Sequence, residues 1–316
     1  MKTFVQLAAL AAVCSALAAS AANAEPFAYA ANEKSGTISV IDTATNTVVS
    51  DIQAGKKPRG MAGTLKQLFV SDQPAKALQV VDIAQKKVVK TIHVGESPEG
   101  VYISPDNKLL SVAVEEDNSV HFVDPDTGET TFVVKTEGKN PEHAVFSTDG
   151  KWVYVSAEDA DSVDIIDVAQ KKQVASVQVG KRPRGIGFTP DGKLAYVASE
   201  LADTVYAIDV ATQKVVATIK AGVRANGITV NPDGKSVYVT NGGDGTVSVI
   251  DVATNTITKT IPVGKRPWNM AITPDGKRLF VANGRSNSVT VIDTEKLEAM
   301  TDIAVGEMPW GVFIPR

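Results

Sequence analysis

The sequence predicts an all-β protein, a seven-bladed β-propeller with four antiparallel strands in each blade. Two features with the same spacing predict this fold. A glycine that ends an apolar phrase recurs every 40 to 43 residues, at Gly55, Gly95, Gly138, Gly180, Gly222, Gly264 and Gly306. An aspartate that ends a β-branched run keeps this spacing, at Asp42, Asp82, Asp124, Asp167, Asp209, Asp251 and Asp293. A period in the low forties, composed of β-formers and turn residues, is typical of a propeller with four strands per blade.

The repeat from 183 to 222 shows how one period becomes one blade. Pro190, Asp191 and Gly192 form a turn signal, because proline presets φ and glycine accepts a positive φ. A second turn is expected at 211–213. The four strands of this blade are then expected at 184–189, 194–199, 204–209 and 215–220. Strands of about six residues are the usual length, and no helix is expected after residue 24.

The two ends of the repeat array are out of phase, and this predicts how the ring closes. Residues 27–32 match the second strand of a blade, with no inner strand before them. Residues 309–314 match an inner strand, with no second strand after them. We therefore expect the C-terminal strand to complete the N-terminal blade, which removes the open edge that invites aggregation.

Residues 1–24 are expected to be a signal peptide that is cleaved after Ala24. Lys2 precedes an apolar, alanine-rich stretch, and Ala22 and Ala24 are the small residues that a signal peptidase requires. The stretch is shorter than the roughly 18 apolar residues of a membrane-spanning helix. The only cysteine, Cys14, lies within it. Residues 25–316 are therefore expected to form a single propeller domain, periplasmic or secreted, with no membrane span.

Three phrases carry a resemblance to a known family. Tyr238-Val-Thr-Asn241, Phe280-Val-Ala-Asn283 and Tyr29-Ala-Ala-Asn32 are each followed by a β-branched run that ends in aspartate. The chain resembles the YVTN family of β-propeller repeats over all seven repeats. The resemblance implies an exported bacterial protein. Some members are linked to quinone-dependent alcohol oxidation, others resemble a periplasmic protein that binds single-stranded DNA, and more distant relatives are lactonases. No functional residue is carried over from these relatives.

Candidate functional residues are those that differ between repeats, because the recurring residues build the scaffold. One position begins each inner strand, directly after the proline of the Gly-x-x-Pro phrase (Ala225 replaces the proline in the fifth copy). Around the ring it holds Arg59, Glu99, Glu142, Arg184, Asn226, Trp268 and Trp310. All seven are polar, charged or Trp, and such a channel mouth is where propellers usually bind something. His143 is a further candidate, because most other copies have glycine at its position. These eight residues are the predicted ligand-binding site.

The loops expected around this mouth carry opposite charges. Acidic loops hold Glu115, Glu158 and Glu200, while basic loops hold Lys57, Arg182 and Arg266, among others. A carboxylate arc opposite two tryptophans suits an amine, another cation or a flat polar ligand. Salt bridges between the loops are the alternative use of these charges. A calcium-like site built from Glu99, Glu115, Glu142 and Glu158 is chemically conceivable, but no spaced Asp/Asn loop motif supports it. We therefore expect no metal and no cofactor.

Three functions remain open from the sequence. The first is a non-catalytic periplasmic binding or scaffold propeller, a monomer that presents the mouth to an unknown small ligand or partner protein. The second is a lactonase-like hydrolase that uses carboxylates and a bound cation. The third is a single-stranded DNA-binding propeller with Trp268 and Trp310 as stacking platforms. The net charge of −4 argues against nucleic acid, and the absence of a nucleophile motif argues against the enzyme.

Overall fold

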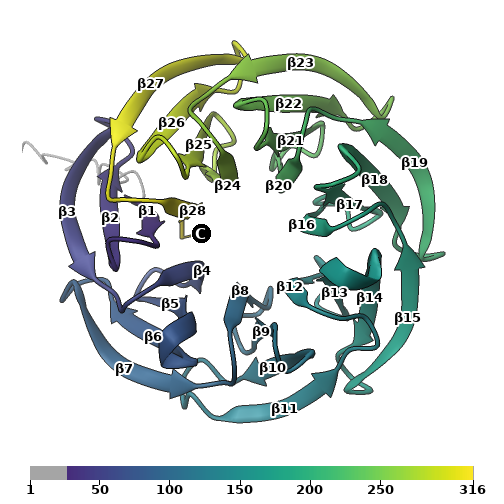
Figure 1. Ribbon diagram of the computed structural model, residues 1–316, viewed down its shortest axis with the longest axis horizontal. Helices are drawn as coiled ribbons and strands as arrows, with labels where there is room; N and C mark the ends of the chain where they lie inside the picture. The colour runs from purple at the N-terminus through teal and green to yellow at the C-terminus, as the bar shows by residue number, and fades with distance from the viewer. Residues whose placement is uncertain (1–26, 316) are drawn as a thin grey trace, which may run out of the picture.

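Seven four-stranded antiparallel sheets are arranged in a ring around a central channel (Figure 1). The structure is a computed structural model and describes residues 27–315. The predicted signal peptide therefore lies outside the described residues. In the described part of the chain no helix is both long and apolar enough to cross a membrane.

Each blade contributes one strand to each of four concentric positions. The inner strands are β4 (Pro58–Gly63), β8 (Pro98–Ile103), β12 (Pro141–Phe146), β16 (Pro183–Phe188), β20 (Ala225–Val230), β24 (Pro267–Ile272) and β28 (Pro309–Phe313). The second strands are β5 (Gln67–Asp72), β9 (Leu110–Val114), β13 (Trp152–Ala157), β17 (Leu194–Ser199), β21 (Ser236–Asn241), β25 (Arg278–Asn283) and β1 (Phe27–Asn32).

The remaining strands form the outer half of each blade. The third strands are β6 (Ala77–Asp82), β10 (Ser119–Val123), β14 (Ser162–Asp167), β18 (Thr204–Asp209), β22 (Thr246–Asp251), β26 (Ser288–Asp293) and β2 (Thr37–Asp42). The outer strands are β7 (Lys87–His93), β11 (Thr130–Lys135), β15 (Lys172–Gln178), β19 (Lys214–Lys220), β23 (Thr256–Pro262), β27 (Glu298–Ala304) and β3 (Thr47–Gln53). The four strands predicted for the repeat from 183 to 222 begin and end within one residue of β16 to β19.

The ring closes as the end phrases predict. β28 pairs antiparallel with β1, so the final strand completes the blade that β1, β2 and β3 begin. The described C-terminal end therefore lies at the channel (Figure 1). Because β28 supplies the inner strand of this blade, it also supplies the seventh side chain at the channel mouth.

Most of the core lies between neighbouring blades. Tyr154 of one blade packs edge-on against Phe188 of the next, with ring centroids 4.9 Å apart. Tyr196 and Tyr238 repeat this placement in the next two interfaces and are almost completely buried. Burying a large apolar side chain contributes roughly 1.5–3 kcal/mol, so each interface between blades adds several kcal/mol of stability.

The recurring aspartates stabilise turns, as their positions predict. Asp42 accepts hydrogen bonds from the amides of Ala44 and Thr45 at 2.8 and 2.9 Å, and these bonds lower its pKa. Asp191 of the Pro-Asp-Gly turn accepts from the Thr189 hydroxyl at 2.7 Å. One prediction was incomplete, because two single-turn 3-10 helices, η1 (Gln73–Ala75) and η2 (Glu158–Ala160), follow second strands. Both of them lie at the channel mouth.

Candidate ligand-binding site at the channel mouth

A β-bulge directs one side chain of every inner strand toward the channel mouth. In β4, Pro58 pairs with Asp72 and Met61 pairs with Val70, so the inner strand has one residue more than its partner. The same shift in pairing occurs after the first residue of five other inner strands, β8, β12, β16, β20 and β24. It recurs where β28 pairs with β1. A bulge bends its strand and changes the direction of a side chain. The seven residues predicted from the repeat all lie in these bulges.

The residue after each ring position explains why glycine recurs there. A Cβ on Gly60 would lie 2.3 Å from the carbonyl oxygen of Glu99, on the neighbouring inner strand. Glycine thus allows the inner strands to approach closely around a narrow channel. The amide of Gly60, which lies in the bulge, donates to the Ser71 hydroxyl at 2.9 Å. A side chain of the second strand is therefore the hydrogen-bond acceptor for this amide.

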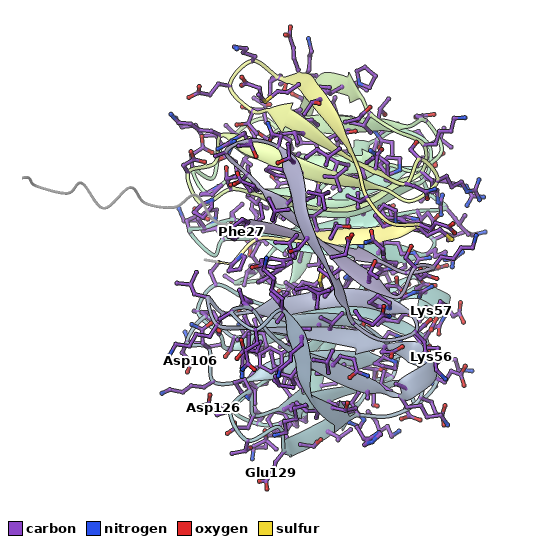
Figure 2. The ribbon with its side chains drawn as sticks, turned by 90° about the vertical axis from the view of Figure 1, so that its left-hand side faces the viewer. Phe27, Lys56, Lys57, Asp106, Asp126 and Glu129 are labelled. Carbon is purple, nitrogen blue, oxygen red and sulfur yellow. The ribbon has the colours of Figure 1, made fainter. Side chains whose placement is uncertain are left out.

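The bulged side chains and the loops after the second strands enclose a cavity of about 280 Å³, here called the mouth cavity. It lies on the face that carries Lys56 and Lys57, opposite the face that carries Asp106 and Asp126 (Figure 2). Its walls are Glu33, Arg59, Gln73, Glu115, Glu142, Glu158, Arg182, Arg184, Asn226, Arg266, Trp268, Asn269 and Trp310. Six of the eight predicted site residues are in this set, and Glu99 and His143 are not.

A second ring of residues, one directly after each second strand, surrounds the channel, and four of its seven members line the mouth cavity. Around the channel this position holds Glu33, Gln73, Glu115, Glu158, Glu200, Gly242 and Gly284. Sequence reasoning noted three of these acids but missed Glu33 and Gln73. The same comparison between repeats, applied to the residue that follows each second-strand phrase, would have found both.

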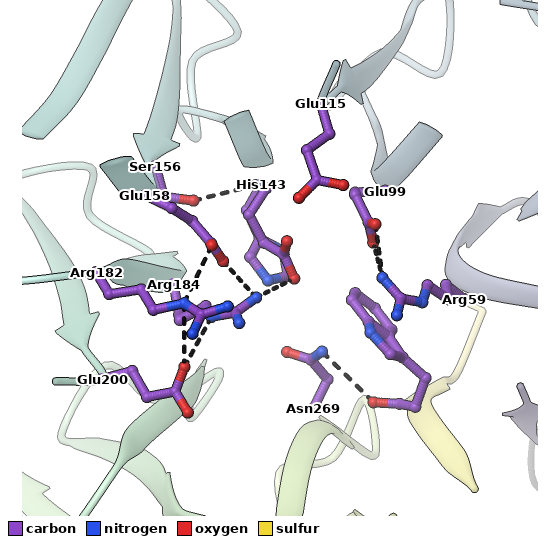
Figure 3. Close-up of polar contacts among 12 residues, drawn as sticks. Arg59, Glu99, Glu115, His143, Ser156, Glu158, Arg182, Arg184, Glu200 and Asn269 are labelled. Carbon is purple, nitrogen blue, oxygen red and sulfur yellow. Dashed lines mark hydrogen bonds and ion pairs between the residues drawn. The ribbon is translucent and has the colours of Figure 1, made fainter. Parts of the chain in front are cut away.

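Arg184 joins the carboxylates of three different loops and strands. Its Nη1 lies 2.6 Å from Glu142 Oε1 and 2.5 Å from Glu158 Oε1, and its Nε donates to Glu200 Oε2 at 3.1 Å (Figure 3). Arg182 donates to Glu158 at 3.1 Å, and Arg266 donates to Glu200 at 2.7 Å. The expected salt bridges between acidic and basic loops are thus present here. They hold η2 and the loop after β17 against the channel wall.

Arg59 makes a second cluster on the other side of the mouth. Its Nη1 donates to both Glu99 oxygens, at 2.6 and 2.7 Å (Figure 3). Its Nε donates to Glu33 at 3.1 Å. Gln73 also donates to Glu99. Because Glu99 is fully buried beneath Arg59, it supports the arginine and does not line the mouth cavity.

Burial and neighbouring charges move the pKa values of these carboxylates in opposite directions. Burial raises the pKa of Glu158 to about 7, with a further contribution from the nearby Glu142 charge. Burial and Glu142 also raise the pKa of Glu99 well above its usual value. Burial acts in the same direction on Glu142, but the charge of Arg184 outweighs it and keeps the pKa of Glu142 below its usual value. At neutral pH Glu142 is therefore ionised, while Glu158 is close to its pKa and only partly protonated.

His143 is enclosed behind the cavity wall. Its Nδ1 lies 2.6 Å from the Tyr102 hydroxyl, its ring stacks on Trp310 at 5.7 Å between centroids, and the side chain is 1% exposed. The absence of a Cβ on Gly100 leaves room for the imidazole, since a Cβ there would lie 3.1 Å from Nδ1. Burial lowers the pKa of His143 to about 4, so the ring is neutral at physiological pH. The structure therefore gives His143 a packing role beneath Trp310.

Trp268 lies in a blade whose second-ring residue is glycine, whereas the blade of Trp310 carries Glu33 at this position. A Cβ on Gly284 would lie 2.3 Å from the Trp268 ring, so this glycine makes room for the indole. Arg266 lies over the other side, with Cζ 5.9 Å from the Trp268 ring centroid. Asn269 donates to the carbonyl oxygen of Trp310 at 3.5 Å (Figure 3). Trp268 is partly exposed to the cavity, while Trp310 is 8% exposed.

Three carboxylates lie close enough to share one cation. Ligand oxygens of Glu99, Glu115 and Glu142 lie within 4.8 Å of one another. Glu158, the fourth member of the calcium-like set considered from the sequence, is bound instead to Arg184 and Arg182. Carboxylate oxygens are the ligands that Ca²⁺ prefers, but two of the three acids already bind an arginine.

Comparisons with known proteins relate the chain to propeller families. A model of lactonase, 7-bladed beta-propeller, matches residues 168–308; a model of the cytochrome D1 heme domain matches residues 105–227; and a model of a YNCE-like beta-propeller matches residues 12–104. Each match spans less than half of the 316 residues. No curated protein sequence matches the chain significantly.

Solved structures show the same fold. Hydrazine synthase from Kuenenia stuttgartiensis is similar with a TM-score of 0.78 and 25% identity, over 84% of this chain and 92% of the other. A functionally unknown protein from Desulfotomaculum acetoxidans DSM 771 has a TM-score of 0.80 and 18% identity, over 92% and 99% of the two chains. The latter likeness concerns the fold alone.

The mouth cavity does not fit a haem, the group that the cytochrome D1 match suggests. Haem iron is held by His, Met, Cys or Tyr side chains. None of these residue types is among the described residues that line the mouth cavity. The nearest histidine, His143, is held by Tyr102 and Trp310. The chain is thus a seven-bladed propeller that is similar in part to the lactonase and cytochrome D1 domains.

Proposed function

We propose that this chain is an exported binding propeller that holds a small polar ligand in the mouth cavity without transforming it. One observation carries the proposal. Seven equivalent bulges carry side chains of four kinds, Arg, Glu, Asn and Trp, and six of these side chains line one cavity of about 280 Å³. A scaffold alone needs no such variation, because the same bulge and the same glycine recur around the ring.

The contacts of the charged groups support binding over catalysis. A general base needs an available lone pair within hydrogen-bond reach of substrate. Glu99, Glu142 and Glu158 each accept hydrogen bonds or ion pairs from an arginine, and His143 is neutral and enclosed. These contacts hold the polar groups of the wall in fixed positions. Such a wall selects a ligand by charge and shape.

The pattern of residues 1–24 and the resemblance to the YVTN family support export of the protein to the periplasm. The ligand would then be a molecule that reaches this compartment. Expression of the whole chain, followed by N-terminal sequencing of the periplasmic protein, tests this part. A mature chain that starts at Glu25 is expected, and full-length protein retained in the cytoplasm would contradict export.

A binding experiment tests the main proposal. Purified protein is incubated with the low-mass fraction of a bacterial extract, separated by gel filtration and analysed by mass spectrometry. A small molecule is expected to co-elute with the wild type and with Trp152→Phe, which changes the tryptophan that does not line the mouth cavity. Trp268→Ala should release it. If no small molecule co-elutes, or if Trp268→Ala retains it fully, the mouth cavity is not the binding site.

A hydrolase with a bound cation is the second candidate, favoured by the cluster of Glu99, Glu115 and Glu142. The lactonase match supports it at the level of the family, although residues 168–308 include none of these three acids. Calorimetric titration with Ca²⁺ and a lactone hydrolysis assay with and without chelator distinguish it from pure binding. Hydrolysis that is lost with chelator and with Glu115→Gln would establish the enzyme and overturn the proposal of binding alone.

A further inference from the structure

The mouth cavity continues into a second cavity along the channel. This throat cavity has a volume of about 570 Å³, and Arg59, Asn269 and Trp310 line both cavities. Its other walls come mainly from the later residues of the inner strands. They include Met61, Ile103, Val145, Ile228, Met270 and Phe313. A polar mouth thus leads into a mainly apolar throat.

The apolar side chains of the throat are not fully packed. Ile103, Val145, Ile228 and Phe313 remain partly exposed inside the channel, although they belong to inner strands. The strands are five or six residues long, so the throat runs for up to roughly 20 Å. Ligand pockets in proteins usually combine such apolar walls with a few polar groups at one end. The channel therefore suits an elongated molecule with one polar end.

The charges at the mouth indicate the sign of that polar end. Arg59, Arg182, Arg184 and Arg266 each bind at least one glutamate. Glu115 is different. Its carboxylate accepts a hydrogen bond from the Ser97 hydroxyl at 2.9 Å, and among the described residues no lysine or arginine forms an ion pair with it. Glu115 lines the mouth cavity, and its oxygen lies within 4.8 Å of Glu142 and Glu99 oxygens.

We propose that the channel binds an elongated organic cation, with an ammonium group at Glu115 and a hydrocarbon chain in the throat. Glu115 and Glu142 supply acceptors for the ammonium, and Trp310 lines both cavities at the junction between head and chain. Indole rings attract cations and also cover apolar surface, so Trp310 suits both parts of this ligand. This inference rests on the proposed function and names the ligand class for the same site.

Binding of three simple probes tests the ligand class. Octylamine, butylamine and octanoate are titrated below their aggregation concentrations, with calorimetry and tryptophan fluorescence as readouts. Octylamine should bind roughly 100-fold more tightly than butylamine, because four more methylene groups are buried. Octanoate should bind at least about tenfold more weakly than octylamine, because Glu115 repels its carboxylate. Equal binding of octylamine and octanoate, or no dependence on chain length, would overturn the proposal.

Two variants separate the head site from the chain site. Glu115→Gln should weaken octylamine and butylamine alike by about tenfold, with exposed Glu298→Gln as its control. Val145→Phe should fill the throat and remove the preference for octylamine while butylamine binds unchanged. Val216→Phe, on the exposed outer strand β19, is the control for this change. Circular dichroism and melting curves show whether each variant is folded, and folded variants with wild-type affinities would contradict the assignment.

A failure of the proposed ligand class can be distinguished from a failure of the proposed function. If the bacterial extract supplies a bound small molecule that Trp268→Ala releases, but octylamine does not bind, the site is real and the ligand class is wrong. If neither the extract nor the probes supply a ligand, both proposals fail. Binding of Ca²⁺ at Glu115 in competition with octylamine would support the head site, whereas Ca²⁺ binding without octylamine binding would replace the organic cation by a metal.

Discussion

Glu158 makes the stability of this propeller depend on pH in a direction that is unusual for a glutamate. It lies in η2, is 4% exposed, and faces Arg184 and Arg182 with Glu142 nearby. Burial raises its pKa to about 7 from the usual 4.5, and the Glu142 charge adds to the rise. The folded state therefore binds this proton more tightly than the unfolded chain does.

The sign and the magnitude follow from this difference. A group with a raised pKa in the folded state contributes its full stability below about pH 4.5 and loses it as the pH rises through about 7. Each pKa unit corresponds to about 1.4 kcal/mol, so the complete change is roughly 3 kcal/mol. Between pH 5 and pH 8 we expect about 2 kcal/mol of it, because part is already lost at pH 5.

Urea unfolding of the wild type and of Glu158→Gln at pH 5 and pH 8 measures this contribution. The free energy of unfolding of the wild type, relative to the variant, should fall by about 2 kcal/mol between the two pH values. The comparison cancels titrations that both proteins share, such as that of His143, whose lowered pKa acts in the opposite direction. Exposed Glu298→Gln should follow the wild type. The same pH dependence in wild type and Glu158→Gln would refute the reasoning.

Two further predictions concern the ring and its buried charges. Deleting residues 309–316 removes β28 and the buried Trp310 and Val312, which together contribute roughly 3–6 kcal/mol, and leaves β1 unpaired. The truncated chain should be unfolded or should melt at least 10 °C lower, and a melting curve like that of the full chain would disprove this closure. Arg184→Met should cost about 3–5 kcal/mol at pH 8, because it leaves buried carboxylates without their partner. Exposed Arg224→Met should cost less than about 1 kcal/mol in the same urea unfolding assay; equal costs would show that Arg184 is not the central partner.

The fold was predictable because every repeat carries the same information. Seven copies of one strand and turn pattern average out local ambiguity, so strand ends are predicted to within a residue in the clearest repeat. The bulge at each ring position was not predicted. A one-residue bulge disturbs the alternation of polar and apolar residues only weakly, since the strands on both sides of it are apolar.

The candidate site was predictable in part, and the missing part has a physical cause. Comparing repeats at one position identified the ring of bulged residues, because they vary strongly within a phrase that otherwise recurs. The enclosure of Glu99 and His143 depends on which neighbour covers them. Arg59 lies over Glu99, and Trp310 stacks on His143 from across the channel. The first contact joins neighbouring blades and the second depends on the closure of the ring, and a comparison of repeats contains neither.

The residues of the second ring differ in how they meet the side chains of the mouth. At Glu33, Glu158 and Glu200, arginines extend across the position and form ion pairs. Where it holds Gly284, a Cβ would collide with Trp268, so an acid there would displace the indole. In this blade the indole therefore occupies the space that a side chain at the second-ring position would need. A ligand that contacts both sides of the mouth touches residues from several blades. The site therefore depends on the closed ring and not on any single repeat.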